Sequence, residues 1–481
     1  MQFPSLIGHT AQLYRILRKS SQTGEALASD YFRSKKYIGS KERKLISELV
    51  FASLRMASLI EYCSKQVHDR LQLNVNDYSN EIEAVLATCI IGNQTNAINI
   101  EAFLIPAFGA TTLHDAIQQT LLQKLSFDES NGESWIESIL VEYSILLNNA
   151  QAIVKANALE WESEQSLQLS AYCAMPEWII HSWYNHGVTF EEIISICLSL
   201  HRSASIGIRV NTNAVDRDAV LRSLQELNIQ CAVGAYAPQS IILAERIRLQ
   251  DSKLYQTGAI EIQDEGSQLI SLALNPKPHW RILDYCAGAG GKSLHMAMLQ
   301  LDNGEIYATD IDFGRLKELR FRAEKAQYSS IELVPMHPQK SGKSALDSLK
   351  RTCDAVLVDA PCTGMGTVRR SPNLKWQLKP KHLESIHKKQ VEILEKASEY
   401  VKSNGVLVYA TCSLMWEENA GVVAEFLQHH EEFELSPLSD AFPEYTSNAL
   451  LGKDNTIAML SLNPAKHGTD GFFMCRMIRK E

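Results

Sequence analysis

Short apolar runs alternate with helical stretches from residue 265 to the end of the chain, and this alternation constrains the fold more than any other feature. The apolar runs are Arg281–Asp284, Glu305–Asp310, Ala355–Asp359 and Gly405–Ala410. Strands that alternate with helices are typical of parallel βαβ units, in which each helix returns the chain to the same edge of the sheet. We therefore expect residues 265–481 to form a doubly wound α/β sheet.

The rest of the chain divides into two further regions, so the protein is expected to be multidomain. At ~150 residues per domain, a chain of 481 residues should hold about three domains. Residues 1–160 are poor in glycine and proline and carry apolar residues at helical intervals, which predicts an all-α bundle. Residues 161–264 are expected to contain a helical connector and then a small α/β module, which begins near Ser205.

The N-terminus lacks the apolar core of a signal peptide, and no apolar run approaches the ~18 residues that a membrane-spanning helix needs. We therefore expect a cytoplasmic protein without a membrane partner, and a monomer. The 10 cysteines are scattered without a CxxC pair. Neither a disulfide framework nor a zinc cluster is expected from this spacing, and no metal site is predicted.

The formal net charge of −9 disfavours a nucleic-acid partner, because lysine and arginine make the phosphate contacts of such complexes. Local basic clusters would have to supply the attraction. Two stretches can do so, unless they are ordinary solvated surface. They consist of Arg33, Lys35, Lys36, Lys41, Arg43 and Lys44, and of Arg369, Arg370, Lys375, Lys379, Lys381, Lys388 and Lys389.

A glycine-rich turn, Gly288–Lys292, closely follows the first apolar run. Glycines let backbone N–H groups approach a ligand, and doubly wound sheets bind cofactors at the carboxyl ends of their strands. Asp310 ends the next strand about 20 positions later, where an acidic residue can hold a ribose hydroxyl. A dehydrogenase would share these features, but Ser293 stands where its third glycine belongs, which disfavours a nicotinamide cofactor.

Two later strands each lead into a cysteine. Cys362 stands in Asp-Ala-Pro-Cys after the strand that ends at Asp359, and Cys412 stands in Thr-Cys-Ser after the strand that ends at Ala410. Both cysteines are therefore expected at the edge of the sheet where ligands bind. A single cysteine at a strand end is more often structural, but two of them downstream of a cofactor turn indicate catalysis.

Methylation of cytosine at carbon 5 is a reaction that would use such a pair. Carbon 5 is a poor nucleophile, so a thiolate must first add to carbon 6. Carbon 5 then attacks the methyl group of a sulfonium donor, the proton on carbon 5 is removed, and the thiol is expelled. A second cysteine can assist this release. A carboxyl group near N3 helps the ring to accept charge, and Asp359 is the candidate.

These motifs resemble those of the RNA (cytosine-5) methyltransferase family of the Sun/RsmB/Nop type. The resemblance implies an α/β Rossmann-like methyltransferase domain, S-adenosylmethionine as cofactor and RNA as substrate. It implies that Cys412 forms the covalent bond to carbon 6, that Cys362 assists product release, and that Lys292 lies near the target base. The cofactor-binding residues that it implies are Cys286, Ala287, Gly288, Ala289, Gly290, Gly291, Lys292, Asp310, Arg315 and Asp359. The terminal signature of the family recurs as Asp470-Gly471-Phe472-Phe473.

The resemblance continues upstream of the last domain. Gln263–Gln268 and the small α/β module resemble an RNA-recognition-like subdomain, and Ser40–Arg55 is similar to the NusB-like RNA-binding domain of the bacterial 16S ribosomal RNA enzyme. The resemblance thus implies ribosomal RNA. One departure is that Leu333–His337 lacks the acidic residue that the family usually places near the adenine amine.

Four other functions are weighed against this interpretation. A DNA cytosine-5 methyltransferase would use the Pro-Cys cysteine and leave Thr-Cys-Ser without a role. An amino-group methyltransferase would carry an aromatic Pro-Pro-Tyr element where Ala360-Pro361-Cys362 stands. A transfer RNA cytosine-5 methyltransferase would show the same catalytic motifs. A catalytically idle ribosome-assembly factor that only binds RNA would not need both cysteines.

Overall fold

The computed structural model describes residues 2–20, 24–71, 79–95, 97, 112–125, 127, 129–244, 247–334, 336 and 346–481. Pro335 and His337, in the stretch that lacks the family's acidic residue, lie outside the described residues. The chain forms two compact units. Unit 1 contains residues 1–203 and 367–378, and unit 2 contains residues 204–366 and 379–481.

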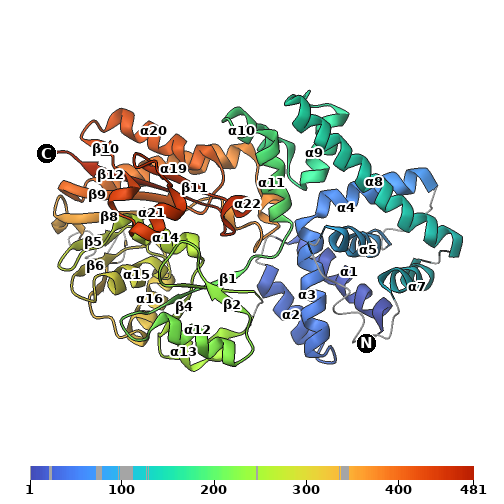
Figure 1. The fold of residues 1–481 in the computed structure, drawn as a ribbon, viewed down its shortest axis with the longest axis horizontal. Helices are drawn as coiled ribbons and strands as arrows, with labels where there is room; N and C mark the ends of the chain where they lie inside the picture. The colour runs from blue at the N-terminus through green and yellow to red at the C-terminus, as the bar shows by residue number, and fades with distance from the viewer. Residues whose placement is uncertain are drawn as a thin grey trace. The chain divides into compact units, whose positions relative to one another are not determined.

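Unit 1 is helical throughout its described residues (Figure 1). Helix α1 lies at its centre and packs against α2, α3, α5 and α7. Apolar side chains of α1 such as Leu6, Leu13 and Leu17 recur every three to four residues and are fully buried, as expected for a helix with one core-facing stripe. The helices of unit 1 are α1 (Phe3–Lys19), α2 (Gly24–Ser34), α3 (Ser40–Arg55), α4 (Ala57–Leu71), α5 (Ser79–Gln94), α7 (Leu113–Leu125), α8 (Glu129–Ala156), α9 (Glu164–Cys173), α10 (Glu177–Asn185), α11 (Phe190–Leu200) and α18 (Leu374–Gln377).

The segment 367–378 belongs to unit 1 although its neighbours in the chain belong to unit 2. Asn373 donates a hydrogen bond to the carbonyl of Leu17 over 2.8 Å. Buried Arg55, at the end of α3, donates to the carbonyls of Arg369 over 3.2 Å and of His201 over 3.0 Å. These bonds fasten the segment among the helices.

Lys375, the centre of this segment, is fully buried. Its Nζ donates to the carbonyl of Arg55 over 2.7 Å. Burial lowers the pKa of Lys375 to about 7; the thiols of Cys197 and Cys173 oppose this shift and the charge of Arg55 adds to it. The interpretation of Lys375 as part of a basic surface is therefore wrong, because a buried ammonium group cannot reach a phosphate. Arg369 is also buried.

Unit 2 begins with a small antiparallel sheet of strand order β2-β3-β1-β4. Its elements are β1 (Ile206–Val210), α12 (Arg217–Glu226), β2 (Cys231–Val233), β3 (Ser240–Leu243), η1 (Leu249–Asp251), α13 (Lys253–Gln256) and β4 (Ile260–Ile262). Asp216 caps α12 by accepting a hydrogen bond from the N–H of Ala219. Apolar residues of β1, β3, β4 and α12, such as Ile208, Ile241, Ile260 and Leu224, form its core.

The large sheet has the strand order β10-β12-β9-β8-β5-β6-β7, with β11 paired to β12. The strands from β7 to β9 are parallel, whereas β12 runs antiparallel between β9 and β10. The strands are β5 (Arg281–Asp284), β6 (Glu305–Ala308), β7 (Ile331–Leu333), β8 (Cys353–Asp359), β9 (Val401–Thr411), β10 (Phe433–Leu435), β11 (Met459–Leu462) and β12 (Phe472–Arg479). The helical elements are α14 (Glu265–Leu274), α15 (Gly291–Leu299), α16 (Phe313–Lys325), η2 (Met365–Thr367), α19 (Pro380–Ser398), η3 (Trp416–Glu418), α20 (Ala420–His429), η4 (Leu438–Asp440), α21 (Glu444–Leu450) and α22 (Pro464–His467).

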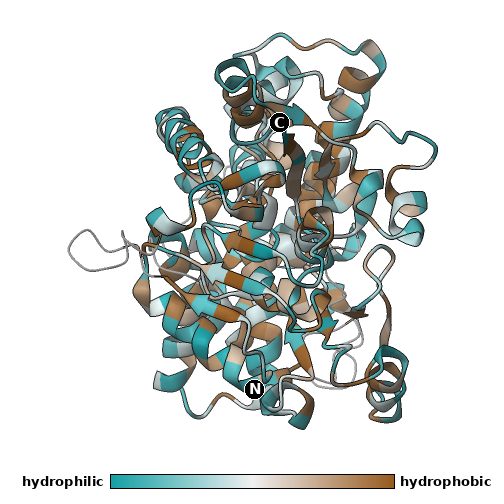
Figure 2. Ribbon diagram, turned by 90° about the vertical axis from the view of Figure 1, so that its left-hand side faces the viewer, coloured by the Kyte–Doolittle hydropathy of each residue, from teal (hydrophilic) through white to brown (hydrophobic). Residues whose placement is uncertain are grey.

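Helices cover both faces of this sheet. Val356 and Val358 of β8 point into one apolar core with residues of α19 and α20. Ala355 and Leu357 point into a second core with residues of α14 and α15. The central strands are therefore buried on both faces, and Figure 2 shows the strands near the C-terminus in the brown of hydrophobic residues. Buried parallel strands read as continuous apolar runs for this reason.

The predicted fold class is confirmed: a helical N-terminal region, a small α/β module and a C-terminal Rossmann-like sheet follow one another. The predicted domain boundaries at residues 160 and 264 remain predictions. None of the helices among the described residues has both the length and the apolar character that a membrane crossing requires.

Buried Lys375 should make the stability of the protein depend on pH. Its pKa in the folded protein, about 7, lies below the ordinary value of 10.5. Between these values the unfolded chain binds more protons, so stability rises with pH. The melting temperature of the wild type, measured relative to that of Lys375→Met, should therefore increase from pH 7 to pH 10 and stay level below pH 6. Exposed Lys379→Met is the control. A difference that does not change between pH 6 and pH 10 contradicts the prediction.

Candidate active site

The glycine turn between β5 and α15 adopts a backbone that side chains would obstruct. Gly288 and Gly290 have φ angles of 54° and 83°, in the left-handed region that glycine tolerates best. A Cβ atom on Gly290 would also lie 2.0 Å from a side-chain carbon of Leu319. The turn can therefore bring its backbone close to a ligand at the carboxyl end of β5.

Asp310, at the end of β6, holds this turn from one side. Its carboxylate accepts hydrogen bonds from the N–H of Gly288 over 2.8 Å and from the N–H of Asp312 over 2.7 Å. Arg315 lies nearby on α16, with an exposed side chain and its Nε 3.8 Å from a carboxylate oxygen of Asp312. The predicted ribose-binding carboxylate is thus fixed beside the turn.

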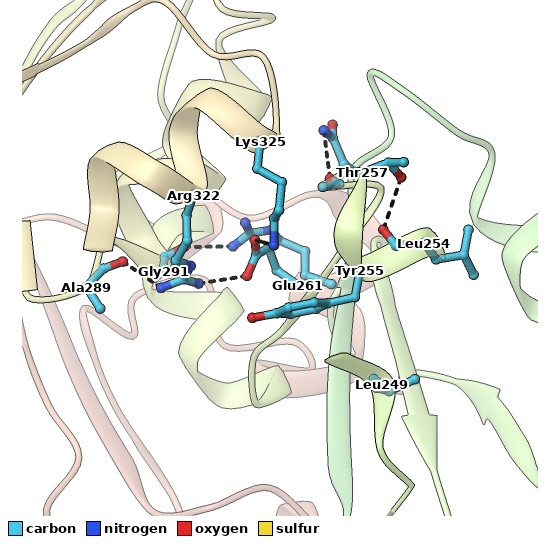
Figure 3. A network of polar contacts seen from close by, with 12 residues as sticks. Leu249, Leu254, Tyr255, Thr257, Glu261, Ala289, Gly291, Arg322 and Lys325 are labelled. Atoms are coloured by element: carbon cyan, nitrogen blue, oxygen red, sulfur yellow. Dashed lines mark hydrogen bonds and ion pairs between the residues drawn. The ribbon is translucent and has the colours of Figure 1, made fainter. Parts of the chain in front are cut away.

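Two arginines also hold the turn, and Figure 3 shows one of them, Arg322, beside Ala289 and Glu261. Arg209 of β1 donates to the carbonyl of Gly291 over 2.7 Å, and Arg322 of α16 donates to the carbonyl of Ala289 over 2.5 Å. Glu261 of β4 accepts from Arg322 over 2.8 Å. Burial lowers the pKa of Arg209 to about 10, although the charge of Glu261 opposes this shift. Two strands of the small module therefore support the glycine turn.

Lys292, the last residue of the turn, forms an ion pair with Asp359 at the end of β8. Its Nζ lies 2.6 Å from the Asp359 carboxylate, and the two side chains are 12% and 32% exposed. Burial disfavours the ammonium form of Lys292, but the charge and hydrogen bond of Asp359 outweigh it and raise the pKa of Lys292. The negative charge of a Cys412 thiolate acts in the same direction. A fixed positive charge therefore lies within electrostatic reach of Cys412.

The two strand-end cysteines meet. The Sγ atoms of Cys362 and Cys412 are 3.3 Å apart, and both residues are partly exposed. The register of β8 and β9 places Asp359 beside Ala410, so the residues that follow leave the sheet together. The N–H of Gly366 donates to the carbonyl of Cys412 over 2.9 Å and holds the two loops against each other.

The terminal Asp-Gly-Phe-Phe signature lies behind these loops. The N–H of Gly471 donates to the carbonyl of Gly366 over 2.9 Å. A Cβ atom on Gly366 would lie 1.9 Å from the carbonyl oxygen of Gly471. The signature therefore provides a backbone surface against which the Cys362 loop packs.

Comparisons with known proteins identify the family of this chain. Residues 271–478 match the family model described as 16S rRNA methyltransferase RsmB/F, and residues 175–250 match a ferredoxin-like domain of RsmF/B-like methyltransferases. The probable ribosomal RNA small subunit methyltransferase B of Bacillus subtilis is 32% identical over 65% of this chain and 68% of its own length. The chain belongs to the RsmB/F methyltransferase family.

Two further similarities extend this membership of the RsmB/F family. The ribosomal RNA small subunit methyltransferase B of Yersinia pestis is 24% identical over 95% of both chains. A crystal structure described as a methyltransferase homolog protein from Pyrococcus horikoshii is 26% identical, with a TM-score of 0.54 over 66% of this chain and 99% of that one. The similarity to the Yersinia pestis protein extends over the helical unit as well as the large sheet.

A methyltransferase of this family needs a methyl donor, and the charges around the turn suit S-adenosylmethionine. Asp284, at the end of β5, is 1% exposed. One of its oxygens accepts from the Ser293 hydroxyl over 2.6 Å, and the other has no hydrogen-bond partner within the described residues. Burial raises the pKa of Asp284 to about 7, and the charges of Asp359 and Asp310 add to this shift. Three carboxyl groups thus share one site, which fits a ligand with a sulfonium and an ammonium charge.

The predicted site residues lie at one edge of the large sheet. Lys292, Asp359, Cys362 and Cys412 form a connected group, and the turn from Cys286 to Gly291 lies beside it with Asp310. Burial raises the pKa of the Cys286 thiol, and the charges of Asp284, Asp359 and Asp310 raise it further. The roles assigned to these residues, and to Arg315 in the cofactor site, remain predictions.

The sequence analysis missed three kinds of residue at this site. Asp284 carried a usable signal, since it is an acidic residue at a strand end directly before a glycine turn. Glu418, whose carboxylate accepts hydrogen bonds from both cysteine loops, carried a weaker one, since it is one of two adjacent acidic residues shortly after Thr-Cys-Ser. Arg209 lies 82 residues before Gly291, its partner, and carried no local signal.

Gly290→Ala should weaken binding of S-adenosylmethionine, because the new methyl group strains the backbone and meets Leu319. Gly452→Ala is a matched control: its φ angle is 61°, but a Cβ atom there would meet nothing within 4 Å. We expect the dissociation constant, measured by calorimetry, to rise about tenfold or more for Gly290→Ala, since each 1.4 kcal/mol corresponds to a factor of ten. Equal affinities of the two variants would show that the turn does not contact the donor.

Proposed function

We propose that this protein transfers a methyl group from S-adenosylmethionine to carbon 5 of a cytosine in RNA. The reaction passes through a covalent bond between Cys412 and carbon 6, and the RNA is ribosomal. The observation that carries the proposal is the pair of thiols 3.3 Å apart, next to a lysine–carboxylate pair and a glycine turn. Membership of the RsmB/F family supports methyl transfer.

Electrostatics favour Cys412 as the nucleophile. The Lys292 ammonium and the sulfur of Cys412 interact, and a nearby positive charge stabilises a thiolate, which is the reactive form. The pKa of Cys362 lies well above the ordinary value of a thiol. Its hydrogen bond to Cys412 raises it most, followed by burial and by the negative charges of Cys412 and Glu418. Cys362 therefore keeps its proton, and the Lys292 ammonium lies where it can stabilise the thiolate that Cys412 needs for attack.

This difference also gives Cys362 its role. In its protonated form, Cys362 can donate a hydrogen bond to the Cys412 sulfur, which has to leave carbon 6 as a thiolate at the end of the reaction. A donor at 3.3 Å stabilises that departing charge. Loss of the donor should slow the release of product more than the first attack on carbon 6.

Asp359 and Lys292 act on the cytosine ring. When the Cys412 thiolate adds to carbon 6, the electron pair of the C5=C6 bond moves into the ring and increases the negative charge at N3 and O2. The Lys292 ammonium can donate a hydrogen bond to the ring and stabilises the added charge, while the Asp359 carboxylate orients that ammonium and can accept a hydrogen bond from the exocyclic amine of cytosine beside N3. Their 2.6 Å contact keeps both groups at the same position beside the ring.

S-adenosylmethionine, when bound, supplies an electrophilic methyl group to carbon 5. The residues that would hold it are Cys286–Lys292, Asp310, Arg315 and Asp359, together with Asp284. Asp310 is already oriented by two backbone N–H groups, so its free lone pairs can accept ribose hydroxyls. In the elimination that ends the reaction, a base takes the proton from carbon 5, the C–H electron pair re-forms the C5=C6 bond, and the C6–S bond breaks to release Cys412 as a thiolate.

The two cysteines should give opposite phenotypes. Cys412→Ala should abolish methylation and every covalent enzyme–RNA species, because no electrons reach carbon 5 without the thiolate. Cys362→Ala should still attack and methylate, but release should slow, so that a protein–RNA adduct accumulates. Denaturing electrophoresis of each variant with RNA and S-adenosylmethionine measures the adduct. Buried Cys475→Ala, remote from both loops in the chain, is the control.

The reverse pattern assigns the nucleophile to Cys362. If the adduct accumulates in Cys412→Ala and is absent in Cys362→Ala, the arrangement of roles is that of a DNA-type cytosine-5 enzyme. If wild-type enzyme forms no adduct with RNA that contains 5-fluorocytosine, whose fluorine blocks the final elimination, the covalent mechanism is wrong.

The substrate RNA is tested in cells. Bisulfite sequencing of total RNA should detect a 5-methylcytosine in small-subunit ribosomal RNA that disappears when the gene is deleted and returns when it is restored. Restoration with the Cys412→Ala variant should leave the site unmethylated. A lost site in transfer RNA, with ribosomal RNA unchanged, would make this a transfer RNA methyltransferase. Restored methylation by the inactive variant would point to an indirect effect.

A further inference from the structure

Glu418 is a buried acidic residue that the proposed mechanism does not use. It ends the short helix η3 and is fully buried. Its carboxylate accepts hydrogen bonds from the N–H of Thr363 over 2.7 Å and from the Thr363 hydroxyl over 2.5 Å. It also accepts from the hydroxyl of Ser413 and from the side-chain amide of Gln390, the latter over 3.2 Å. Four donors therefore satisfy one carboxylate.

These donors flank the two cysteines. Thr363 directly follows Cys362, and Ser413 directly follows Cys412. Their hydroxyl oxygens lie 3.5 Å apart, bridged by the same carboxylate. Gln390 of α19 also donates to the carbonyl of Pro361 over 2.9 Å. Glu418 thus fastens the two loops whose sulfur atoms have to meet.

The charge of Glu418 acts on the sulfur of Cys362. Its contacts given above are all neutral groups, so no cation cancels its charge there. The pKa of Cys362 is raised by its hydrogen bond with Cys412 and by burial, and the negative charge of the Glu418 carboxylate raises it further. Lys292 acts on Cys412 instead. Glu418 therefore opposes the thiolate form of Cys362, whereas Lys292 is a cation that interacts with Cys412.

We propose that Glu418 is a positioning residue for the reaction inferred above: it holds the two cysteine loops at contact distance and keeps the proton on Cys362. This inference rests on the proposed function. Glu418 touches neither cytosine nor cofactor, yet in this proposal it controls which of the two cysteines attacks. A purely structural role would instead be limited to the stability of the loops.

The test compares Glu418→Gln, which keeps the shape and removes the charge, with Glu425→Gln. Glu425 lies on α20, is partly exposed and pairs with His387, so it controls for loss of a carboxylate elsewhere. The first measurement is the rate at which each protein forms an adduct with 5-fluorocytosine RNA. The second is the pH dependence with which iodoacetamide alkylates Cys362 and Cys412 in the full-length protein without RNA, followed by peptide mass spectrometry. Among the described residues, the titratable groups that interact electrostatically with Cys362 include Cys412, Glu418 and Tyr409.

We expect Glu418→Gln to lower kcat and the rate of adduct formation about 10- to 100-fold, the range for loss of hydrogen bonds to a charged group. The KM for RNA should stay within about twofold, since Glu418 does not face the substrate. Alkylation of Cys362 should begin at lower pH, because the negative charge that opposed its thiolate is gone. Glu425→Gln should match the wild type in kcat, in the rate of adduct formation, in KM and in the alkylation profile.

Two further variants separate the charge from the tether. Ser413→Ala and Thr363→Val remove hydrogen bonds to Glu418 but keep its charge, so adduct formation should slow while the alkylation profile of Cys362 does not move to lower pH. They decide the question if Glu418→Gln fails to fold. Wild-type adduct rates in both variants, or an unchanged Cys362 profile in folded Glu418→Gln, would overturn the inference. Absence of an adduct in the wild type would instead reject the proposed function, and the alkylation profiles would still test Glu418.

Discussion

The parallel pairing of β8 and β9 is the constraint on which the site depends. Asp359 lies beside Ala410 in this register, and the chain leaves both strands at the same edge. A shift of one residue would turn every side chain of a strand to the opposite face, and the two apolar cores that hold the sheet would lose their partners. The two cysteines are therefore held near each other mainly by the free energy gained when valine and leucine side chains, several residues away in these strands, are buried. On the other side of β8, β5 adds the glycine turn to the same edge.

The sequence analysis predicted those parts of the molecule that local patterns encode. The buried strands β5, β6, β8 and β9 appear as apolar runs because both of their faces are covered. Cys362 and Cys412 were assigned to one edge because parallel strands end together. Lys292 and Asp310 follow from the glycine turn and from the end of the next strand. In each case a few adjacent residues hold enough information to place the side chain.

The remaining features depend on contacts between distant residues. Strand β12 pairs antiparallel with β9, whereas the alternation of strands and helices predicted parallel βαβ units without an antiparallel strand being identified. Lys375 looked like one more basic residue in a charged stretch, because burial against Arg55 depends on a contact 320 residues away in the chain. The support that Arg209 gives to the glycine turn has the same origin. No pattern within a short window distinguishes these residues from ordinary surface or core positions.

The membership of residues 367–378 in unit 1 sets an order for folding during protein synthesis. Helices α1 and α3 are synthesised long before this segment. The carbonyl of Arg55 can accept its hydrogen bond only after Lys375 has been made, and the carbonyl of Leu17 only after Asn373, which lies 356 residues later. At ~5–20 residues per second this interval lasts roughly 20 seconds to a minute. During this interval the nascent helices lack residues 367–378, the segment that packs among them in the folded protein. The N-terminal unit is therefore among the first parts of the chain to leave the ribosome and is completed only after β8 and its cysteine loop have been made.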